Sequence, residues 1–414
     1  MDGFAQPTAK NIVTLRWIYV WGPGLLVMLA DTDAGNVVTA AQGGAQWSYR
    51  LLPLLLLLIP MLYMVQELTV RLGIYSGCGH GELIRERFGV PWAWLSLVGL
   101  AVATIGSLVT EFTGVAGIGE LYGVSRVGSL AVAAAALLAI VATGSYRRVE
   151  RIAIVIGLFE LAFFSVAWAA HPNPAIMVKD ALDLPLGNRE FMYMAAAIIG
   201  AVFNPWMIFY QQSAIADKKL RPGDLKTARW DTATGAIVTQ CLTGAVLIAA
   251  AATLAPNGVS TNIGAIGEIS AALSPLLGEG FGRLAFSVGV LGASVVAAIV
   301  SSLALAWGVG EVAGYRRSLE HHPFEVKWFY GVYGACVLGA ATLVGLVPNL
   351  VWLNIAAQVL NAFQLPLVIG LLLALAVKTL PEQVRPRGLH LWLLIGISAG
   401  VIGLGLYGGI SGLL

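Results

Sequence analysis

The chain has 414 residues, of which 58% are hydrophobic and only 11% carry charge. A soluble domain carries about 25% charged residues, so this composition excludes an ordinary soluble protein and favours a membrane protein. The net charge of +2 gives no reason to expect nucleic acid as a partner. The three cysteines, Cys78, Cys241 and Cys336, are widely spaced and indicate neither a disulfide framework nor a thiolate metal site.

Apolar runs long enough to cross a bilayer recur along the whole chain and leave no room for a soluble domain. We therefore expect an all-α polytopic membrane protein with one transmembrane domain over residues 1–414. The eleven predicted spans cover residues 14–44 with an interruption, 51–68, 92–121, 127–143, 150–170, 191–216, 231–255, 282–312, 328–347, 350–377 and 389–411.

The loops between these spans differ in charge. If the N-terminus is inside, most of the 24 Lys and Arg residues face the cytoplasm. Cytoplasmic loops carry such an excess, so we expect a multi-pass protein of the plasma (inner) membrane with its N-terminus inside and its C-terminus outside. The lipid bilayer is its expected surrounding, and the sequence indicates no obligate protein partner.

Five spans followed by five more give two halves of opposite orientation, about 14–170 and 191–377, with one added helix at about 389–411. Inverted repeats of this kind place the substrate site at the midplane, on broken helices at matching positions. Span 1 is interrupted at "DTDAGN", and span 6 at "GAVFNPWM", where Pro205 cannot donate a backbone hydrogen bond. The alternative is two ordinary kinks, since Gly and Pro are common in membrane helices.

Oxygen ligands stand inside both interruptions: Asp33 and Asn36 in the first, Asn204 in the second. A carboxylate at membrane depth is costly and normally has a cation or a proton as its partner. Oxygen-only ligation suits hard cations such as Mg²⁺, Ca²⁺ or Mn²⁺. Asp33 could instead be satisfied by helix N-termini. Asp31 either adds charge to the cavity or faces a water-filled vestibule.

Four stretches resemble the Nramp family of divalent-metal transporters, over nearly the whole chain. "DAGN" at 33–36 resembles the family motif Asp-Pro-Gly-Asn, and "VQELTVRLGIYSGCGHGELIRERFG", with Gln66, resembles the end of its second span. "TEFTGVAGIGELYG" carries Glu111 at the position of the family's acidic residue. "AAQVLNAFQLP" carries Gln358, where a glutamine approaches the metal, and Asn361. The resemblance implies a LeuT-type 5+5 inverted repeat with spans 1 and 6 broken.

Span 6 departs from the family pattern. The family usually reads Met-Pro-His, whereas this chain has Asn204 and Trp206 on either side of Pro205. A thioether is the soft ligand that favours transition metals, and an amide removes that preference. This pair of replacements resembles the Nramp-related branch that transports Mg²⁺. A shifted register would bring Met207 into the site instead. Ala34 also replaces the family's proline.

Residues and resemblance together predict a set of metal ligands and a set of neighbours. The ligands are expected to be side-chain oxygens plus two backbone carbonyls carried over from the family: Asp33, Asn36, Asn204 and Gln358, with Ala30 and Ala201. The candidates for supporting or coupling roles are Asp31, Glu111, Gln66 and Asn361.

We expect this protein to transport divalent cations by alternating access, preferring Mg²⁺, passing Mn²⁺ and remaining uncoupled from protons. The cation is the substrate, and no cofactor or enzyme activity is expected. The five histidines lie in loops or at span ends, so no histidine relay crosses the spans. The alternatives are a proton-coupled Mn²⁺/Fe²⁺ importer of the ordinary Nramp type and an organic-solute transporter. An intramembrane protease would need a motif that the spans lack.

Overall fold

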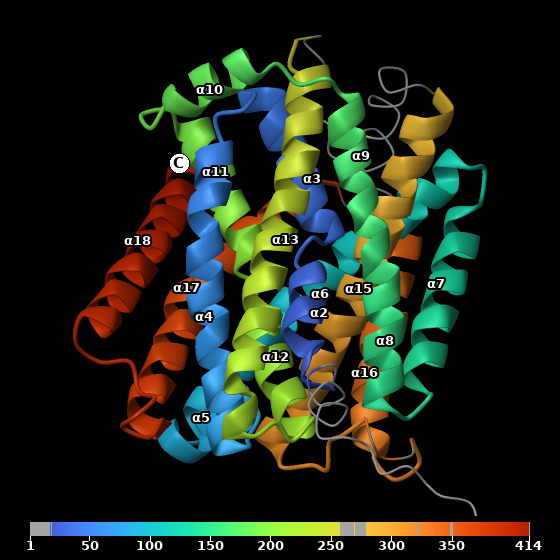
Figure 1. Cartoon of the computed structure of the whole chain (residues 1–414). Coiled ribbons are helices and arrows are strands. Elements are labelled where there is room, and N and C mark those ends of the chain that lie inside the picture. Colours follow the sequence, from blue (N-terminus) through green and yellow to red (C-terminus); the bar gives the residue numbers. More distant parts are fainter. Residues whose placement is uncertain are drawn as a thin grey trace, which may run out of the picture.

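The structure is a computed structural model in which residues 17, 19–256, 269, 279–319, 321, 323–347 and 351–413 are described. The elements within these ranges are helices, and most of them stand side by side in one bundle (Figure 1). In chain order they are α2 (Pro23–Leu29), α3 (Ala34–Trp47), α4 (Leu52–Ser76), α5 (His80–Phe88), α6 (Val90–Leu121), α7 (Arg126–Val141), α8 (Tyr146–Gly157), η1 (Leu158–Leu161), α9 (Ala162–Ala169), α10 (Pro174–Leu182), α11 (Arg189–Val202), α12 (Pro205–Asp217), η2 (Pro222–Asp224), α13 (Leu225–Thr253), α15 (Glu279–Ala313), α16 (Lys327–Leu346), α17 (Val351–Thr379) and α18 (Gly388–Leu413).

Each of the eleven predicted spans corresponds to one helix or to a short series of helices. Nine helical segments within the described ranges are long and apolar enough to cross a membrane. The predicted fourth span is the shorter apolar helix α7, and the first is divided between α2 and α3. The all-α polytopic fold is therefore confirmed. The limits of the two halves, 14–170 and 191–377, stay a prediction.

The two predicted interruptions are real breaks that run in opposite directions. Span 1 runs from α2 at the lower end of Figure 1 to α3 at the upper end, whereas span 6 runs from α11 at the upper end to α12 at the lower end. Four residues separate α2 from α3, and two separate α11 from α12. The break points lie side by side in the middle of the bundle, as inverted repeats require.

Helix α4 continues about two turns beyond the predicted end of its span at residue 68. Hydropathy ended the span because charged residues follow, but those charges are paired within the protein. The Glu67 carboxylate lies 2.6 Å from Arg71, one turn along the same helix, and 2.6 Å from Arg229 of α13. Ion pairing thus allows the helix to carry charge without ending.

Two short helices between the spans, α5 and α10, were not predicted. His80, expected in a loop or at a span end, is the first residue of α5 and is 1% exposed. Its Nδ1 lies 2.8 Å from Oε1 of Gln212 on α12, and its ring packs edge-on against Phe209. Helix α5 therefore packs beneath the lower half of the broken sixth span.

Helix α17 approaches α11 unusually closely. A Cβ atom on Gly200 would lie 1.8 Å from the backbone oxygen of Gln358, so only glycine fits at this crossing. Small residues permit such close packing of membrane helices. The crossing brings the polar residues of α17 directly to the end of α11.

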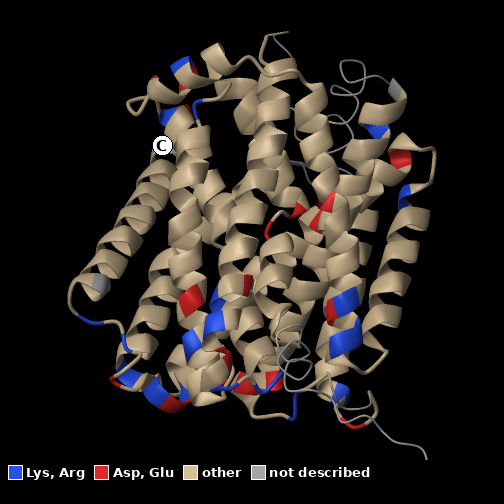
Figure 2. Ribbon diagram, in the orientation of Figure 1, with Lys and Arg blue, Asp and Glu red and all other residues tan. Residues whose placement is uncertain are grey.

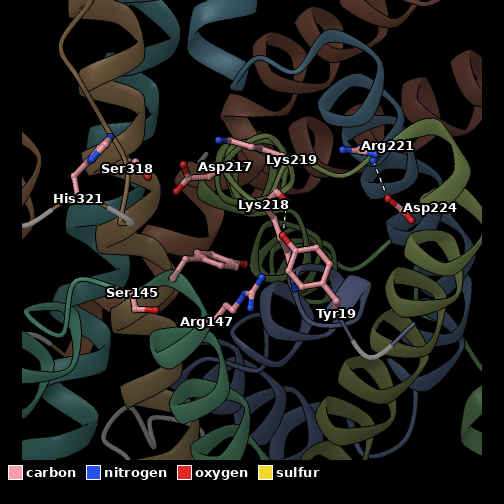
Figure 3. A pocket seen from close by; sticks show the side chains of 11 residues that line it. Tyr19, Ser145, Arg147, Asp217, Lys218, Lys219, Arg221, Asp224, Ser318 and His321 are labelled. Carbon is pink, nitrogen blue, oxygen red and sulfur yellow. Dashed lines mark hydrogen bonds between the residues drawn. The ribbon is translucent and has the colours of Figure 1, made fainter. Parts of the chain in front are cut away.

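Basic residues gather at one end of the bundle, around α5 and the segment after α12 (Figure 2). The C-terminus lies at the opposite end (Figure 1). A cavity of about 680 Å³ lies at the basic end (Figure 3). Its lining includes four basic side chains, which do not suit a metal cation, so this cavity is not the candidate cation site: Arg147, Lys218, Lys219 and Arg221.

Beneath the breaks, bonds between helices hold the basic end together. Asp231 of α13 accepts hydrogen bonds from the backbone N–H groups of Gly22, Gly24 and Leu25, and so anchors the start of α2. Lys218, after α12, contacts Glu150 of α8 at 2.9 Å and donates to a backbone oxygen just before α2. These bonds join the lower halves of both broken spans to α8 and α13.

The burial of His80 leads to a prediction about acid stability. Burial lowers the pKa of His80 from its ordinary value of 6.5 to about 4, although Gln212 opposes the shift. Below pH 6.5 the unfolded chain binds a proton that the folded chain does not, so folded-state stability falls as the pH decreases from 6.5 to about 4. The contribution is roughly 3 kcal/mol.

We expect His80→Asn to reduce this loss, measured as the change in melting temperature of the detergent-solubilised protein between these two pH values. The matched control is His171→Asn, because His171 is exposed. An identical pH dependence in wild type and His80→Asn would contradict the assignment.

Candidate metal-binding site

The first break exposes the backbone ends of two helices and satisfies them with side chains. Asp33 is the N-cap of α3, and its Oδ1 accepts from the backbone N–H of Asn36 at 2.6 Å. The N–H of Ala34 donates to Oε2 of Glu111, on α6, at 3.1 Å. The Asn36 amide in turn donates to the backbone oxygen of Asp31 at 2.9 Å. The loop is therefore held in one shape by its own polar residues.

The second break follows from Pro205. Because this residue has no N–H, the carbonyl of Ala201 loses the hydrogen bond that a continuous helix would give it. The side-chain amide of Asn204 takes that place and donates to the Ala201 oxygen at 2.8 Å. Asn204 is thus the N-cap of α12 and also the partner of the last turn of α11.

Helix α17 joins the two breaks through amide groups. Nδ2 of Asn361 donates to Oδ1 of Asn204 at 2.6 Å and to Oε1 of Gln358 at 3.2 Å. The Gln358 side chain lies against Gly35 in the first break. The predicted ligands Asn204 and Gln358 therefore meet in one place, and Asn361 is the residue that connects them.

The side-chain oxygens near the contact between Asn204 and Asn361 are buried, and several of them lack a hydrogen-bond donor. The side chains of Asp31, Asp33 and Asn36 are completely buried, and those of Asn204 and Gln358 are 1% and 2% exposed. Within the described part of the chain, both oxygens of Asp31, Oδ2 of Asp33 and Oδ1 of Asn36 accept no hydrogen bond of good geometry. Asp31 lies beside Asn204, so it belongs to the gap between the breaks and not to an outer vestibule. Unpartnered buried oxygens are what a cation would satisfy.

The carbonyl of Ala30, the other backbone ligand that the resemblance implies, closes α2 at its C-cap. It accepts no hydrogen bond from the backbone of the described residues, so it is available to a ligand. The C-terminal ends of α2 and α11 thus point partial negative charge at the same gap.

The span-6 register brings Asn204 rather than Met207 to the polar gap. Met207 is fully buried in the first turn of α12 and belongs to the hydrophobic core. Trp206, at the position of the family's histidine, is likewise buried, and its indole nitrogen has no hydrogen-bond partner in the described part of the chain. The side-chain atoms that the two breaks offer to a metal ion are therefore oxygens.

Gln66 lies apart from these residues. Thr69 donates to its backbone oxygen at 2.7 Å and to Oε1 of Gln211 at 2.8 Å, and Gln211 donates to Thr232 at 2.8 Å. This polar chain links α4, α12 and α13. Within the part of the chain that the structure describes, no hydrogen bond joins Gln66 to Asp33 or Asn204, so the structure does not place it at the candidate site.

Glu160, in η1, was not among the site residues predicted from the sequence. It is completely buried, and it is close enough to Asp31, Asp33 and Glu111 to interact with them electrostatically. Acidic residues lie in a group midway between the two ends of the bundle (Figure 2). The signal was present in the sequence, because "GLFELAFF" carries a carboxylate in the centre of an apolar span.

The Nramp family, described as natural resistance-associated macrophage protein-like, matches residues 24–411. The chain belongs to the Nramp family. This Nramp protein is therefore a multi-pass membrane transporter of divalent metal cations and not an enzyme, and metal ions are its substrate rather than a cofactor.

Relatives of known name cover most of this Nramp chain. The divalent metal cation transporter MntH of Bradyrhizobium diazoefficiens is 28% identical over 72% of this chain and 69% of its own. MntH of Yersinia pestis is 29% identical over 75% of this chain and 76% of its own. A crystal structure of the manganese transporter of Eremococcus coleocola matches with a TM-score of 0.80 and 16% identity, covering 98% of this chain and 89% of that one. The LeuT-type fold is thereby confirmed.

The position of Asp33 predicts that its charge is needed for metal binding. Asp33→Asn keeps the shape and can still accept from Asn36, so the break should remain folded while the negative charge is lost. We expect metal uptake into proteoliposomes to be nearly abolished, with normal yield and melting temperature.

Asp180→Asn is the matched control, because Asp180 is also buried but lies in α10, away from the breaks. Near-normal uptake by Asp33→Asn would remove Asp33 from the ligand set and leave Asp31 as the candidate.

Proposed function

We propose that this Nramp protein carries Mg²⁺ across the plasma membrane by alternating access, with Mn²⁺ as a second substrate and without proton coupling. The observation that supports Mg²⁺ is the oxygen-only donor set, in which Asn204 stands where a thioether would favour softer metals. Asp33 supplies charge, and the amides of Asn36, Asn204 and Gln358 ligate the ion or its water. Mg²⁺ releases its water reluctantly, so contacts through water are expected.

The orientation that we propose puts the basic end of the bundle in the cytoplasm (Figure 2). Loops rich in Lys and Arg remain on the cytoplasmic side. The C-terminus, at the opposite end, would then lie outside. In this orientation the lower halves of the broken spans form the inner gate.

The second candidate is a proton-coupled Mn²⁺ importer. It is favoured by the names of the relatives, which are divalent metal or manganese transporters. The buried carboxyl group of Glu111 could carry the proton, because it touches the first break directly. Selectivity and coupling therefore need separate experiments.

A selectivity measurement tests the Mg²⁺ proposal. In proteoliposomes, a millimolar excess of Mg²⁺ should be transported or should inhibit Mn²⁺ uptake. Asn204→Met should shift the preference towards Mn²⁺ or Cd²⁺, because it restores a soft ligand. The control is Asn188→Met, since Asn188 caps α11 at the far end of that helix. If a large excess of Mg²⁺ left Mn²⁺ uptake unchanged, the magnesium assignment would be wrong.

The absence of proton coupling can be tested with a pH-sensitive dye inside the same vesicles. A divalent cation needs no proton to be driven inward, because each charge gains about 2.3 kcal/mol per 100 mV of inside-negative potential. Two charges gain about 4.6 kcal/mol, which is enough to sustain a cation concentration gradient of over ~1000-fold. We expect voltage-driven uptake without acidification. Metal-dependent proton entry that disappears in Glu111→Gln would establish the proton-coupled alternative.

A further inference from the structure

The fifth span carries a carboxylate that the proposed transport site does not use. Glu160 lies in η1, a 3₁₀ turn that interrupts the helix between α8 and α9 in the middle of the span. A 3₁₀ segment within a helix often marks a functional hinge or local strain. Glu160 is completely buried, and neither of its oxygens accepts a hydrogen bond within the described part of the chain. A buried carboxyl group of this kind needs either a proton or a cation as its partner.

The surroundings of Glu160 are rich in oxygen. The hydroxyl of Thr32, in the first break, lies beside its carboxylate, but its hydrogen bond of good geometry joins it to Thr239 at 2.8 Å. On the neighbouring α15, Ser294 lies beside Glu111, and its buried hydroxyl forms no hydrogen bond of good geometry with any described residue. Four elements therefore present oxygen atoms to one region: η1, the first break, α6 and α15.

Helix α15 is pressed against this 3₁₀ turn. A Cβ atom on Gly292 would lie 2.8 Å from the backbone oxygen of Ile156 and 3.0 Å from Cβ of Phe159. A larger residue at this position would push α15 away and withdraw its hydroxyls. The close approach thus holds α15, with Ser294, against the turn that carries Glu160.

The charges in this region do not balance with one transported ion. Asp31, Asp33, Glu111 and Glu160 lie near one another, and none of them forms an ion pair with a described residue. One divalent cation compensates two negative charges, so the other two carboxyl groups take either protons or a second cation. Oxygen donors without nitrogen or sulfur suit a hard cation.

We propose that Glu160, Glu111 and the hydroxyl of Thr32 form a second cation position beside the transported ion, and that this position takes a small hard cation, either Na⁺ or a second divalent ion. This inference rests on the proposed function, since the first ion occupies the position of Asp33. The proposal assigns Glu160, on the fifth span, as a residue that binds a cation beside the candidate metal-binding site.

Metal binding to the purified full chain in nanodiscs tests the second position, with Mn²⁺ as the probe in Na⁺-free and Na⁺-containing buffers of equal ionic strength. A second divalent ion would appear as two bound Mn²⁺ per wild-type chain and one per Glu160→Gln chain. Na⁺ at the second position would appear as one bound Mn²⁺ whose apparent Kd changes roughly tenfold with Na⁺ in wild type and not in Glu160→Gln.

The matched control is Glu120→Gln, because Glu120 is half exposed near the end of α6, and it should behave as wild type in both measurements. The proposal would be overturned if wild type and Glu160→Gln bound the same number of Mn²⁺ ions with the same response to Na⁺. That result would mean that Glu160 is a neutral acid, which the isosteric amide replaces without effect.

Two further measurements separate the possible failures. If wild type binds no Mn²⁺, the proposed function is contradicted. In that case, a rise in melting temperature with Na⁺ that is lost in Glu160→Gln would still support the second position. No such rise in wild type would overturn the second position. Glu160→Gln removes an unpartnered buried charge, so it should fold with an unchanged or higher melting temperature. If it does not fold, Glu160→Asp keeps the charge, withdraws it from Thr32 and should weaken cation binding.

Discussion

Backbone groups without partners in the middle of a membrane are the constraint on which this structure depends. A bilayer offers no water to an open N–H or C=O group, so a broken helix must be completed by side chains. Glu111 completes the start of α3, and Asn204 completes the end of α11. The polarity of the candidate site is a consequence of the breaks as much as of the ion. A hydrophobic residue at either position would leave a buried backbone group unsatisfied.

Each half of a broken span depends on an unbroken neighbour for its position. Helix α13 holds α2 through Asp231, and α17 holds α11 through the crossing at Gly200. Helix α13 also packs along α3, so both halves of the first span share this support. The first span and the upper half of the sixth span therefore rest against different unbroken helices.

Much of the fold and part of the site could be predicted from the sequence. Hydropathy located the spans, and the polar residues at Asp33 and Asn204 identified the breaks because such residues are rare at membrane depth. Glu160 shows the limit of that method. One acid in an apolar span has many possible neighbours, and only the packing of η1 against the first break and α15 shows where it lies.

Residues whose role depends on a partner far along the chain were the least predictable. Asn361 is separated by 157 positions from Asn204, to which it donates, and nothing in the local pattern selects that contact. His80 is similar, because the loop composition around it gives no sign that Gln212, 132 positions away, buries it. The charged end of α4 was misjudged because hydropathy scores each residue alone, whereas Glu67 and Arg71 neutralise each other.

The amide chain that joins Ala201, Asn204, Asn361 and Gln358 also has a consequence for how tightly an ion can be held. Each of these oxygens already accepts one hydrogen bond, so an ion that ligates Asn204 or the Ala201 carbonyl through the second lone pair competes with the bond from Asn361 or from Asn204. Metal binding weakens or replaces internal hydrogen bonds, and only the difference appears as affinity. When the ion departs, the amides close on one another again, so release leaves no open backbone group behind. A carrier that must let its cargo go on every cycle benefits from a site that recovers its own bonds once it is empty.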